Sequence, residues 1–161
     1  MHRMLSAAVL GATVVLALTP SAALADQGNG RHLGNDLLRS ALTPAVPTDA
    51  PIDGVKAGGL PWVIDRGEVR LRVGGRLDVR IEGLQVPRAD GTADNPVPSV
   101  DALVFCGAAK VADSGPQPLS VPGGDLRLRT TVALPSACVS PTVLISPTAT
   151  AGGAYIASAI G

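Results

Sequence analysis

Histidine is nearly missing from this sequence, and both copies stand close to the N-terminus. The chain of 161 residues has only His2 and His32. A Ser-His-Asp or Cys-His nucleophilic site needs an imidazole base, and a histidine zinc site needs imidazole ligands. Because no histidine follows residue 32, the expected folded domain has neither kind of site. This is the first reason to predict that the protein is not an enzyme.

Aromatic side chains are equally scarce. Trp62, Phe105 and Tyr155 are the only three. Carbohydrate-binding modules usually stack sugar rings on a platform of several aromatics, so the composition argues against that class. We expect Trp62 in the core, because a domain this poor in aromatics needs its largest side chain to fill the interior. For Tyr155 the pattern decides neither burial nor exposure.

The chain also lacks an excess of charge of either sign. It has 13 Lys and Arg against 13 Asp and Glu, and hence no net charge at neutral pH. Nucleic acids and anionic membrane surfaces attract proteins whose net charge is positive. We therefore predict no nucleic-acid partner and no general electrostatic attraction to membranes.

A hydrophobic run of membrane-spanning length is missing as well. The apolar stretch from Leu5 to Leu18 is shorter than the ~20 residues that cross a bilayer. It follows a short basic start, and small residues ending in Ala23-Leu24-Ala25 come after it. This pattern is typical of a signal peptide over residues 1–25, with cleavage before Asp26. We expect a secreted protein with no membrane span after processing.

Cysteine is limited to Cys106 and Cys138. In an exported protein an even pair most simply forms one disulfide, because the compartment is oxidising. Closing a loop of about thirty residues contributes roughly 3 to 4 kcal/mol in the chain-entropy model. A catalytic redox pair would normally stand close together, as in C-x-x-C. We therefore predict a structural bridge.

Residues 26–56 mix glycine, asparagine, aspartate and proline with few apolar side chains. We interpret them as a flexible, disordered leader with at most a marginal turn of helix from Asn35 to Leu42. The alternative is that Leu37, Leu38 and Leu42 dock on the domain as a short amphipathic helix.

Residues 57–161 carry short runs of Val, Ile and Leu, punctuated by Gly and Pro every several residues. This is typical of an antiparallel all-β domain. The expected strands are Leu60–Asp65, Glu68–Val73, Arg76–Leu84, Val100–Cys106, Ala109–Asp113, Asp125–Leu134, Thr142–Ser146 and Ala154–Ala159. The predicted fold is an immunoglobulin-like β-sandwich, and an open Greek-key barrel is the alternative, because sequence alone does not assign strands to sheets.

The stretch GEVRLRVGGRLDVRIEG, residues 67–83, alternates apolar and charged residues on both sides of a Gly-Gly pair. A two-residue turn would set apolar residues opposite charged ones, so we expect a three-residue loop, Gly74–Arg76, with a bulge. The resulting pairs are Val73 with Leu77, Leu71 with Val79 and Val69 with Ile81. Charges on the outer face then have opposite charges as diagonal neighbours, which predicts a self-neutralising surface rather than a docking site.

Two later stretches differ in the faces they bury. Residues 125–129 alternate charged residues with leucine, which predicts a strand with one solvent-exposed and one buried face. Residues 102–112 are apolar on both faces, as in a central, covered strand. The alternative is that Leu103 and Phe105 form an exposed patch for a partner or a second copy.

Carboxylates are the remaining candidates for metal binding. Asp90, Asp94, Asn95 and Asp101 lie in or beside the loop of residues 86–100, where their oxygens could in principle wrap a calcium ion. Their spacing matches no EF-hand, and Asp, Asn, Gly and Pro are the ordinary residues of turns. We therefore predict no metal ligand.

A carboxylate pair could also serve a glycosidase. The candidates are Asp65, Glu68, Asp78 and Glu82. Alternation places them in solvent, whereas a general acid needs a dry pocket that raises its pKa. We therefore predict no catalytic residue and no cofactor.

The segments GGLPWVIDRGEVRL, GRLDVRIEGL, NPVPSV, LVFCG, LPSACVSPTVLI and YIAS together resemble an uncharacterised family of small secreted proteins of G+C-rich Gram-positive bacteria. The likeness covers about residues 58–158. It implies no catalytic residue and no known ligand, and it implies the same Cys106–Cys138 disulfide.

These patterns together favour a secreted, non-catalytic structural or binding module of the extracellular space or cell envelope, with an unidentified extracellular or envelope protein as its partner. The alternative is a small secreted inhibitor of extracellular hydrolases, which would present a Pro-rich loop, residues 115–124 or 86–100. A hydrolase that uses carboxylates alone is a third hypothesis.

Overall fold

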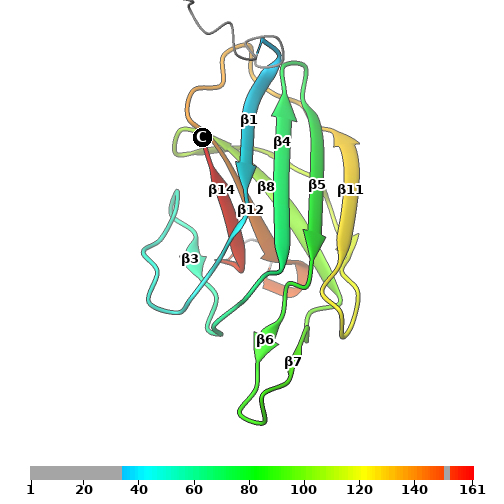
Figure 1. Ribbon diagram of the computed structural model, residues 1–161. Helices are drawn as coiled ribbons and strands as arrows, with labels where there is room; N and C mark the ends of the chain where they lie inside the picture. Colours follow the sequence, from blue (N-terminus) through cyan, green and yellow to red (C-terminus); the bar gives the residue numbers. More distant parts are fainter. Residues whose placement is uncertain (1–33, 151–152) are drawn as a thin grey trace, which may run out of the picture. The chain divides into compact units, whose positions relative to one another are not determined.

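Two antiparallel β-sheets make up most of the fold (Figure 1). The computed structural model describes residues 34–150 and 153–161, so the predicted signal peptide, residues 1–25, lies outside the described residues. The first sheet has the order β1-β4-β5-β11, formed by Asp36–Ala41, Arg66–Arg72, Arg76–Glu82 and Leu126–Thr131. The second sheet has the order β10-β8-β12-β14-β2, formed by Gln117–Pro118, Ser99–Cys106, Pro141–Pro147, Ala157–Ile160 and Thr43–Pro44; β9 (Ala109–Asp113) pairs with β8.

Two short strand pairs and one 3-10 helix, Thr148–Thr150, complete the described elements. Strand β3 (Lys56–Ala57) pairs in parallel with β13 (Ala154–Tyr155). Strands β6 (Val86–Pro87) and β7 (Ala93–Asp94) form a hairpin that projects past the ends of the sheets (Figure 1). The described residues include no helix that is both long and apolar enough to span a membrane.

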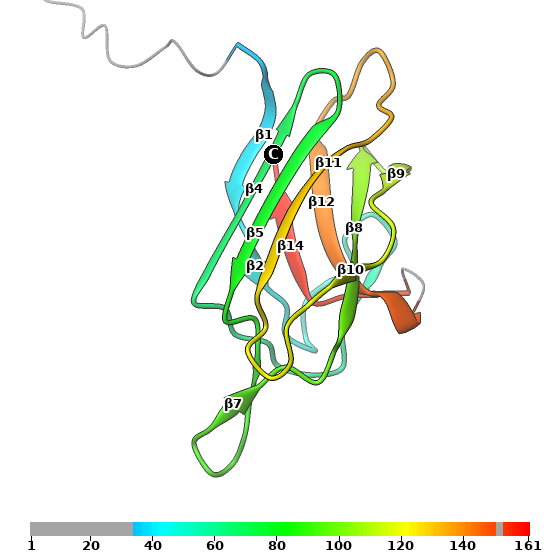
Figure 2. The ribbon, with the colours of Figure 1, turned by 90° about the vertical axis from the view of Figure 1, so that its right-hand side faces the viewer.

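The main hydrophobic core lies between the two sheets, which face each other in Figure 2. Leu71 and Leu77 of the first sheet and Val104, Val143 and Ile145 of the second are fully buried there. Full burial of such side chains contributes about 1.5 to 3 kcal/mol each. The predicted antiparallel all-β fold is confirmed, and the finer immunoglobulin-like assignment stays a prediction.

The β4–β5 hairpin keeps the predicted apolar stripe but differs in register. Its three-residue loop is Val73–Gly75 rather than Gly74–Arg76. The last residue of such a loop takes the left-handed conformation. The observed loop places Gly75 there, at φ 82°, whereas the predicted loop would have placed Arg76 there. Positive φ is strained for residues with a side chain, so the turn forms where the glycines stand. The predicted pairs are therefore wrong, and the observed ones are Leu71 with Leu77, Val69 with Val79 and Gly67 with Ile81.

The predicted leader is wrong from Gly34 onward, because residues 36–41 form strand β1 at the edge of the first sheet. Leu38 and Leu42 are 3% and 4% exposed, so they dock on the domain as the alternative expected, but from a strand rather than a helix. The predicted strand Leu60–Asp65 is also wrong. Only one isolated bridge, Val63 to Gln85, forms there, because β1 occupies the place beside β4.

A second, smaller core covers the other face of β8. Leu103 and Phe105 pack there with Val55, Leu144 and Tyr155. The Tyr155 hydroxyl donates a hydrogen bond to the Ala50 carbonyl at 3.1 Å, which ties the covering segment to the sheet. Strand β8 is therefore covered on both faces, as predicted, and the exposed-patch alternative is wrong.

Two aromatic residues are buried, and the two cysteines are bonded to each other. Trp62 is 3% exposed and belongs to the main core, as predicted, and Tyr155 is buried. Cys106 and Cys138 form the predicted disulfide, with their Cα atoms 4.9 Å apart. The bridge joins the end of β8 to the segment that leads into β12. The predicted strand Ala154–Ala159 is split into β13 and β14.

Candidate functional site

The outer surface of the first sheet gathers most of the described arginines. Alternation along each strand sends apolar side chains into the core and charged ones outward. The four strands β1, β4, β5 and β11 carry eight arginines and four carboxylates: Arg39, Arg66, Arg70, Arg72, Arg76, Arg80, Arg127 and Arg129, with Asp36, Glu68, Asp78 and Glu82. This surface, called the arginine face below, has a surplus of four positive charges.

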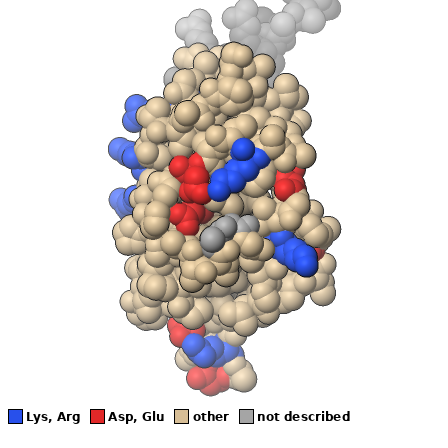
Figure 3. Space-filling model, turned by 180° about the vertical axis from the view of Figure 1, so that it is seen from behind, with Lys and Arg blue, Asp and Glu red and all other residues tan. Residues whose placement is uncertain are grey.

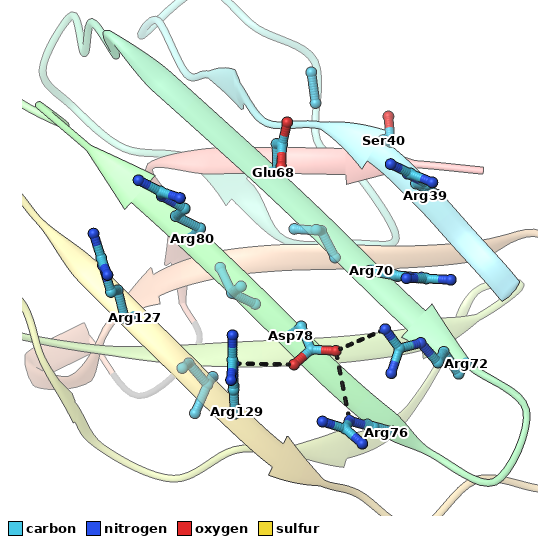
Figure 4. Close-up of a pocket in the computed structure, with 14 residues that line it drawn as sticks. Arg39, Ser40, Glu68, Arg70, Arg72, Arg76, Asp78, Arg80, Arg127 and Arg129 are labelled. Carbon is cyan, nitrogen blue, oxygen red and sulfur yellow. Dashed lines mark ion pairs between the residues drawn. The ribbon is translucent and has the colours of Figure 1, made fainter.

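The sheet register places these side chains in rows that cross the strands (Figure 4). One row holds Arg39 opposite Arg70, then Asp78, then Arg129. The next row holds Glu68, Arg80 and Arg127 on three successive strands. Opposite residues in adjacent antiparallel strands have Cβ atoms about 4.5 to 5.5 Å apart. The register therefore sets two arginines side by side in each row.

Asp78 is surrounded by three arginines. Its carboxylate lies 3.5 Å from Arg72, 3.7 Å from Arg76 and 3.7 Å from Arg129 (Figure 4). One negative charge is thus shared among three guanidinium groups. Arg72 also lies 3.7 Å from Asp36, the partner of Arg70. Four arginines thus share two carboxylates, which leaves two positive charges uncompensated in this part of the face.

Asp36 is the most buried of the ion-paired carboxylates on the face. Its side chain is 2% exposed, and Arg70 Nε donates to Oδ1 at 2.8 Å and to Oδ2 at 2.9 Å. The hydrogen bond from Arg70 lowers the pKa of Asp36, and the same bond raises the pKa of Arg70. Arg70 therefore serves to hold β1 against β4.

Glu82 is held by Arg80 and Arg66. Arg80 donates from Nε at 3.0 Å and also from Nη2, and Arg66 lies 3.8 Å away. The hydrogen bond from Arg80 lowers the pKa of Glu82. A general acid needs a raised pKa, so this carboxylate is poorly suited to the acid role in a glycosidase.

Three arginines on the face have no close ion-pair partner among the described residues. Among residues 34–150 and 153–161, Arg39 and Arg127 form no ion pair. Arg129 has a side chain that is 83% exposed and reaches only Asp78. Their guanidinium donors point to solvent and are available to an anion.

A shallow hollow of about 590 Å³ lies over the arginine face and is lined by residues of all four strands. No aromatic side chain takes part in its lining. Trp62 and Phe105 are 3% exposed and Tyr155 is 2% exposed. The face therefore offers charge and hydrogen-bond donors but no surface on which a ring could stack.

The rest of the described chain carries the opposite charge. Away from the four strands there are three basic residues, Lys56, Arg88 and Lys110, and eight acidic ones, Asp49, Asp53, Asp65, Asp90, Asp94, Asp101, Asp113 and Asp125. Seen from behind, the surface is mostly uncharged with a few small charged groups (Figure 3). The near-zero net charge thus hides a strong separation of charge.

The predicted self-neutralising surface holds for the hairpin but not for the whole sheet face. The observed register sets Arg70 directly opposite Asp78 and Glu68 opposite Arg80, so the outer face of the hairpin is mixed in charge, as predicted. Strands β1 and β11 then add Arg39, Arg127 and Arg129 on its two sides. The alternation in residues 125–129 indicates that Arg127 and Arg129 face solvent. That they lie beside the arginines of the hairpin follows only from the strand order, which places β11 next to β5.

Two of the three carboxylates considered for calcium, Asp90 and Asp94, make other contacts. Asp90 accepts hydrogen bonds from the backbone and hydroxyl of Thr92, and Asp94 pairs with Arg88. Asn95 is 1% exposed and donates to the carbonyls of Val97 and Ser120. In the part of the chain that the structure describes, no three His, Cys, Asp or Glu side chains gather as a metal site would require.

The two loops considered for an inhibitor differ in shape. Residues 86–94 form the projecting β6–β7 hairpin, whose turn is closed by a 2.8 Å hydrogen bond from Arg88 N to Thr92 O. The loop of residues 115–124 contains strand β10 and a cis peptide bond between Val121 and Pro122. Val121 is 58% exposed.

No family model matches this chain, and no curated protein or solved structure is significantly similar to it. The resemblance to a family of small secreted proteins therefore stays a prediction.

Proposed function

We propose that the protein is a secreted, non-catalytic binding module of the extracellular space or cell envelope, and that an anionic ligand binds to its arginine face. One observation carries this proposal: eight arginines against four carboxylates on a single sheet surface. Charges separated by more than about 8 to 10 Å are screened at physiological salt, so the local surplus governs binding more than the net charge does.

The remaining chemistry of the face supports binding rather than catalysis. Guanidinium groups stay protonated and cannot act as general bases at neutral pH. The pKa values of Asp36 and Glu82 are lowered by their arginine partners. Donors that converge on an anion are present, whereas a proton-transferring pair is lacking among the described carboxylates of the face.

Export is supported by two independent features. The N-terminal pattern ends in Ala23-Leu24-Ala25, as signal peptidase substrates do. The Cys106–Cys138 disulfide is typical of oxidising compartments. Recovery of the chain from the culture medium with Asp26 as its first residue tests this part of the proposal.

Calorimetric titration with three polyanions tests the binding proposal. The exported protein is titrated with polyphosphate, poly-L-glutamate and dextran sulfate, and with neutral dextran as the blank. We expect saturable binding to at least one polyanion and none to dextran. Failure to bind all three polyanions would contradict the proposal.

A pair of charge-matched variants locates the binding. Arg127→Glu with Arg129→Glu reverses two exposed charges on the face, and Arg88→Glu with Lys110→Glu makes the same change elsewhere. The first variant is expected to lose binding, and the second to keep it. Equal losses would place the interaction outside the arginine face.

The second proposal is inhibition of an extracellular hydrolase by the β6–β7 hairpin. Its projection beyond the sheets favours this (Figure 2). The Arg88–Asp94 ion pair and the buried Asn95 at its base brace it. Assays against secreted serine, cysteine, aspartic and metalloproteases test it. Stoichiometric inhibition that Arg88→Ala weakens supports the proposal, and no inhibition in any class contradicts it.

A further inference from the structure

We infer that the ligand of the arginine face is a linear polymer of phosphate groups that lies across the strands and is recognised through its phosphate groups alone. This inference rests on the proposed binding of an anion to the face, and it specifies the chemical class of that anion. Three observations carry it: opposed arginines, the extent of the face across four strands and the absence of stacking groups.

The opposed arginines favour phosphate over carboxylate. Arg80 and Arg127 stand directly opposite each other on β5 and β11. Like charges in such positions repel, and an anion between them relieves the repulsion. One guanidinium fork is enough to match the two oxygens of a carboxylate. Each phosphate within a chain carries its charge on two non-bridging oxygens of a tetrahedral centre, whose acceptor directions are not confined to one plane as those of a carboxylate are, so it accepts hydrogen bonds from two forks together.

Both members of this pair have donors to spare. Arg80 uses Nε and Nη2 for Glu82, and a guanidinium has five N–H donors in all. Arg127 makes no ion pair within the described residues. A phosphate therefore binds here without breaking an ion pair that the fold uses.

The extent of the face favours a polymer over a single phosphate. Arg39 and Arg129 lie in one row on the two outer strands of the first sheet. Three strand spacings separate them, roughly 14 Å. One phosphate group reaches only one pair of arginines, whereas a chain reaches both Arg39 and Arg129, at the two ends of the row.

The absence of stacking groups limits what else the face recognises. All three aromatic side chains are buried, and the hollow over the face is lined mainly by charged side chains. Single-stranded nucleic acids and many sugars gain affinity by stacking on aromatics. The face offers no such gain, so a phosphate chain without bases should bind at least as well as single-stranded DNA.

Titration with phosphate, tripolyphosphate and long-chain polyphosphate tests the inference, beside poly-L-glutamate and oligothymidylate at equal charge concentration. We expect affinity to rise with phosphate chain length until the chain spans the face. Long-chain polyphosphate should bind about tenfold or more tightly than poly-L-glutamate, the equivalent of one charge-assisted hydrogen bond. Rising salt should weaken binding. The logarithm of the affinity should fall linearly with the logarithm of the salt concentration, with a slope of about 0.7 per phosphate contacted, as for single-stranded nucleic acids.

Conservative variants test the role of the guanidinium forks. Arg127→Lys keeps the charge but loses the fork, and Arg88→Lys is the matched control on the β6–β7 hairpin. The first is expected to weaken polyphosphate binding several-fold and to leave poly-L-glutamate binding nearly unchanged. The control should alter neither.

The outcomes separate the inference from the function on which it rests. Poly-L-glutamate that binds as tightly as polyphosphate, or oligothymidylate that binds more tightly, overturns the phosphate inference while anion binding stands. Binding that does not depend on chain length also overturns it. If no polyanion binds, both the inference and the proposed function fail.

Discussion

Arg80 of β5 and Arg127 of β11 lie directly opposite each other in the register of the first sheet. Such a pair of like charges costs stability. Arg127 forms no direct ion pair among the described residues, and Glu82 attracts it only at longer range. An anion bound between the two arginines would remove this repulsion, which accounts for the pair in a binding surface. Stability and binding should then change in opposite directions when the pair is altered.

Replacing Arg127 with Thr should stabilise the protein in the absence of ligand. The change removes the repulsion from Arg80, and threonine suits a strand, so we expect a gain of about 0.2 to 1 kcal/mol in the free energy of unfolding. Urea denaturation at low salt measures it. Lower stability than the parent, with anion binding unchanged, would contradict the role assigned to the pair.

The Asp36–Arg70 pair should make the fold sensitive to acid. Because the hydrogen bond from Arg70 lowers the pKa of Asp36 below its ordinary 3.8, the pair contributes stability that is fully present above that pH. This stability is lost as pH falls through the lower folded value. Asp36→Asn should be less stable than the parent at pH 7 and should lose less on acidification to pH 2, as measured by urea denaturation. Parallel losses would contradict this.

Gly74 and Gly75 provide a matched pair for testing the hairpin register. Both have positive φ, 85° and 82°, so alanine at either position costs about 1 to 2 kcal/mol in backbone strain. A Cβ at Gly75 would also lie 1.9 Å from the Val132 carbonyl oxygen, whereas Gly74 has open space around it. Thermal unfolding should show Gly75→Ala to be clearly less stable than Gly74→Ala. Equal effects would argue against the observed turn.

Tyr155 should hold the segment that covers the second core. Tyr155→Phe removes the hydrogen bond to Ala50, which is worth about 0.5 to 1.5 kcal/mol. Ala50 is exposed, so water replaces the lost donor and the cost should fall near the lower value. Limited proteolysis should cut residues 45–57 faster in this variant. Equal cleavage rates would show that packing alone holds the segment.

Local sequence patterns were enough to predict much of the fold. Alternation in residues 67–83 places Leu71 and Val79 in the core, because a strand repeats every two residues. Gly74 and Gly75 mark the turn, although not its exact closing pair. The lone cysteine pair indicates the disulfide. Each of these features depends on near neighbours or on simple pairing.

The features that were missed depend on distant parts of the chain. Strand β1 forms because Leu38 pairs with β4 opposite Leu71 and is buried there, which outweighs a weak local helix preference. The charge of the arginine face depends on which strands flank the hairpin. Arg39 and Arg127 become part of one surface only when β1 and β11 take the two outer positions.

The central claim, that the arginine face binds a phosphate chain, is tested most directly by the NMR signals of the arginine Nε–Hε groups during titration with long-chain polyphosphate. We predict saturable shifts at Arg39, Arg80, Arg127 and Arg129, which lie on the face, and no shift at Arg88 on the β6–β7 hairpin. Shifts at Arg88 alone, or no saturable shift at any arginine, would contradict the claim.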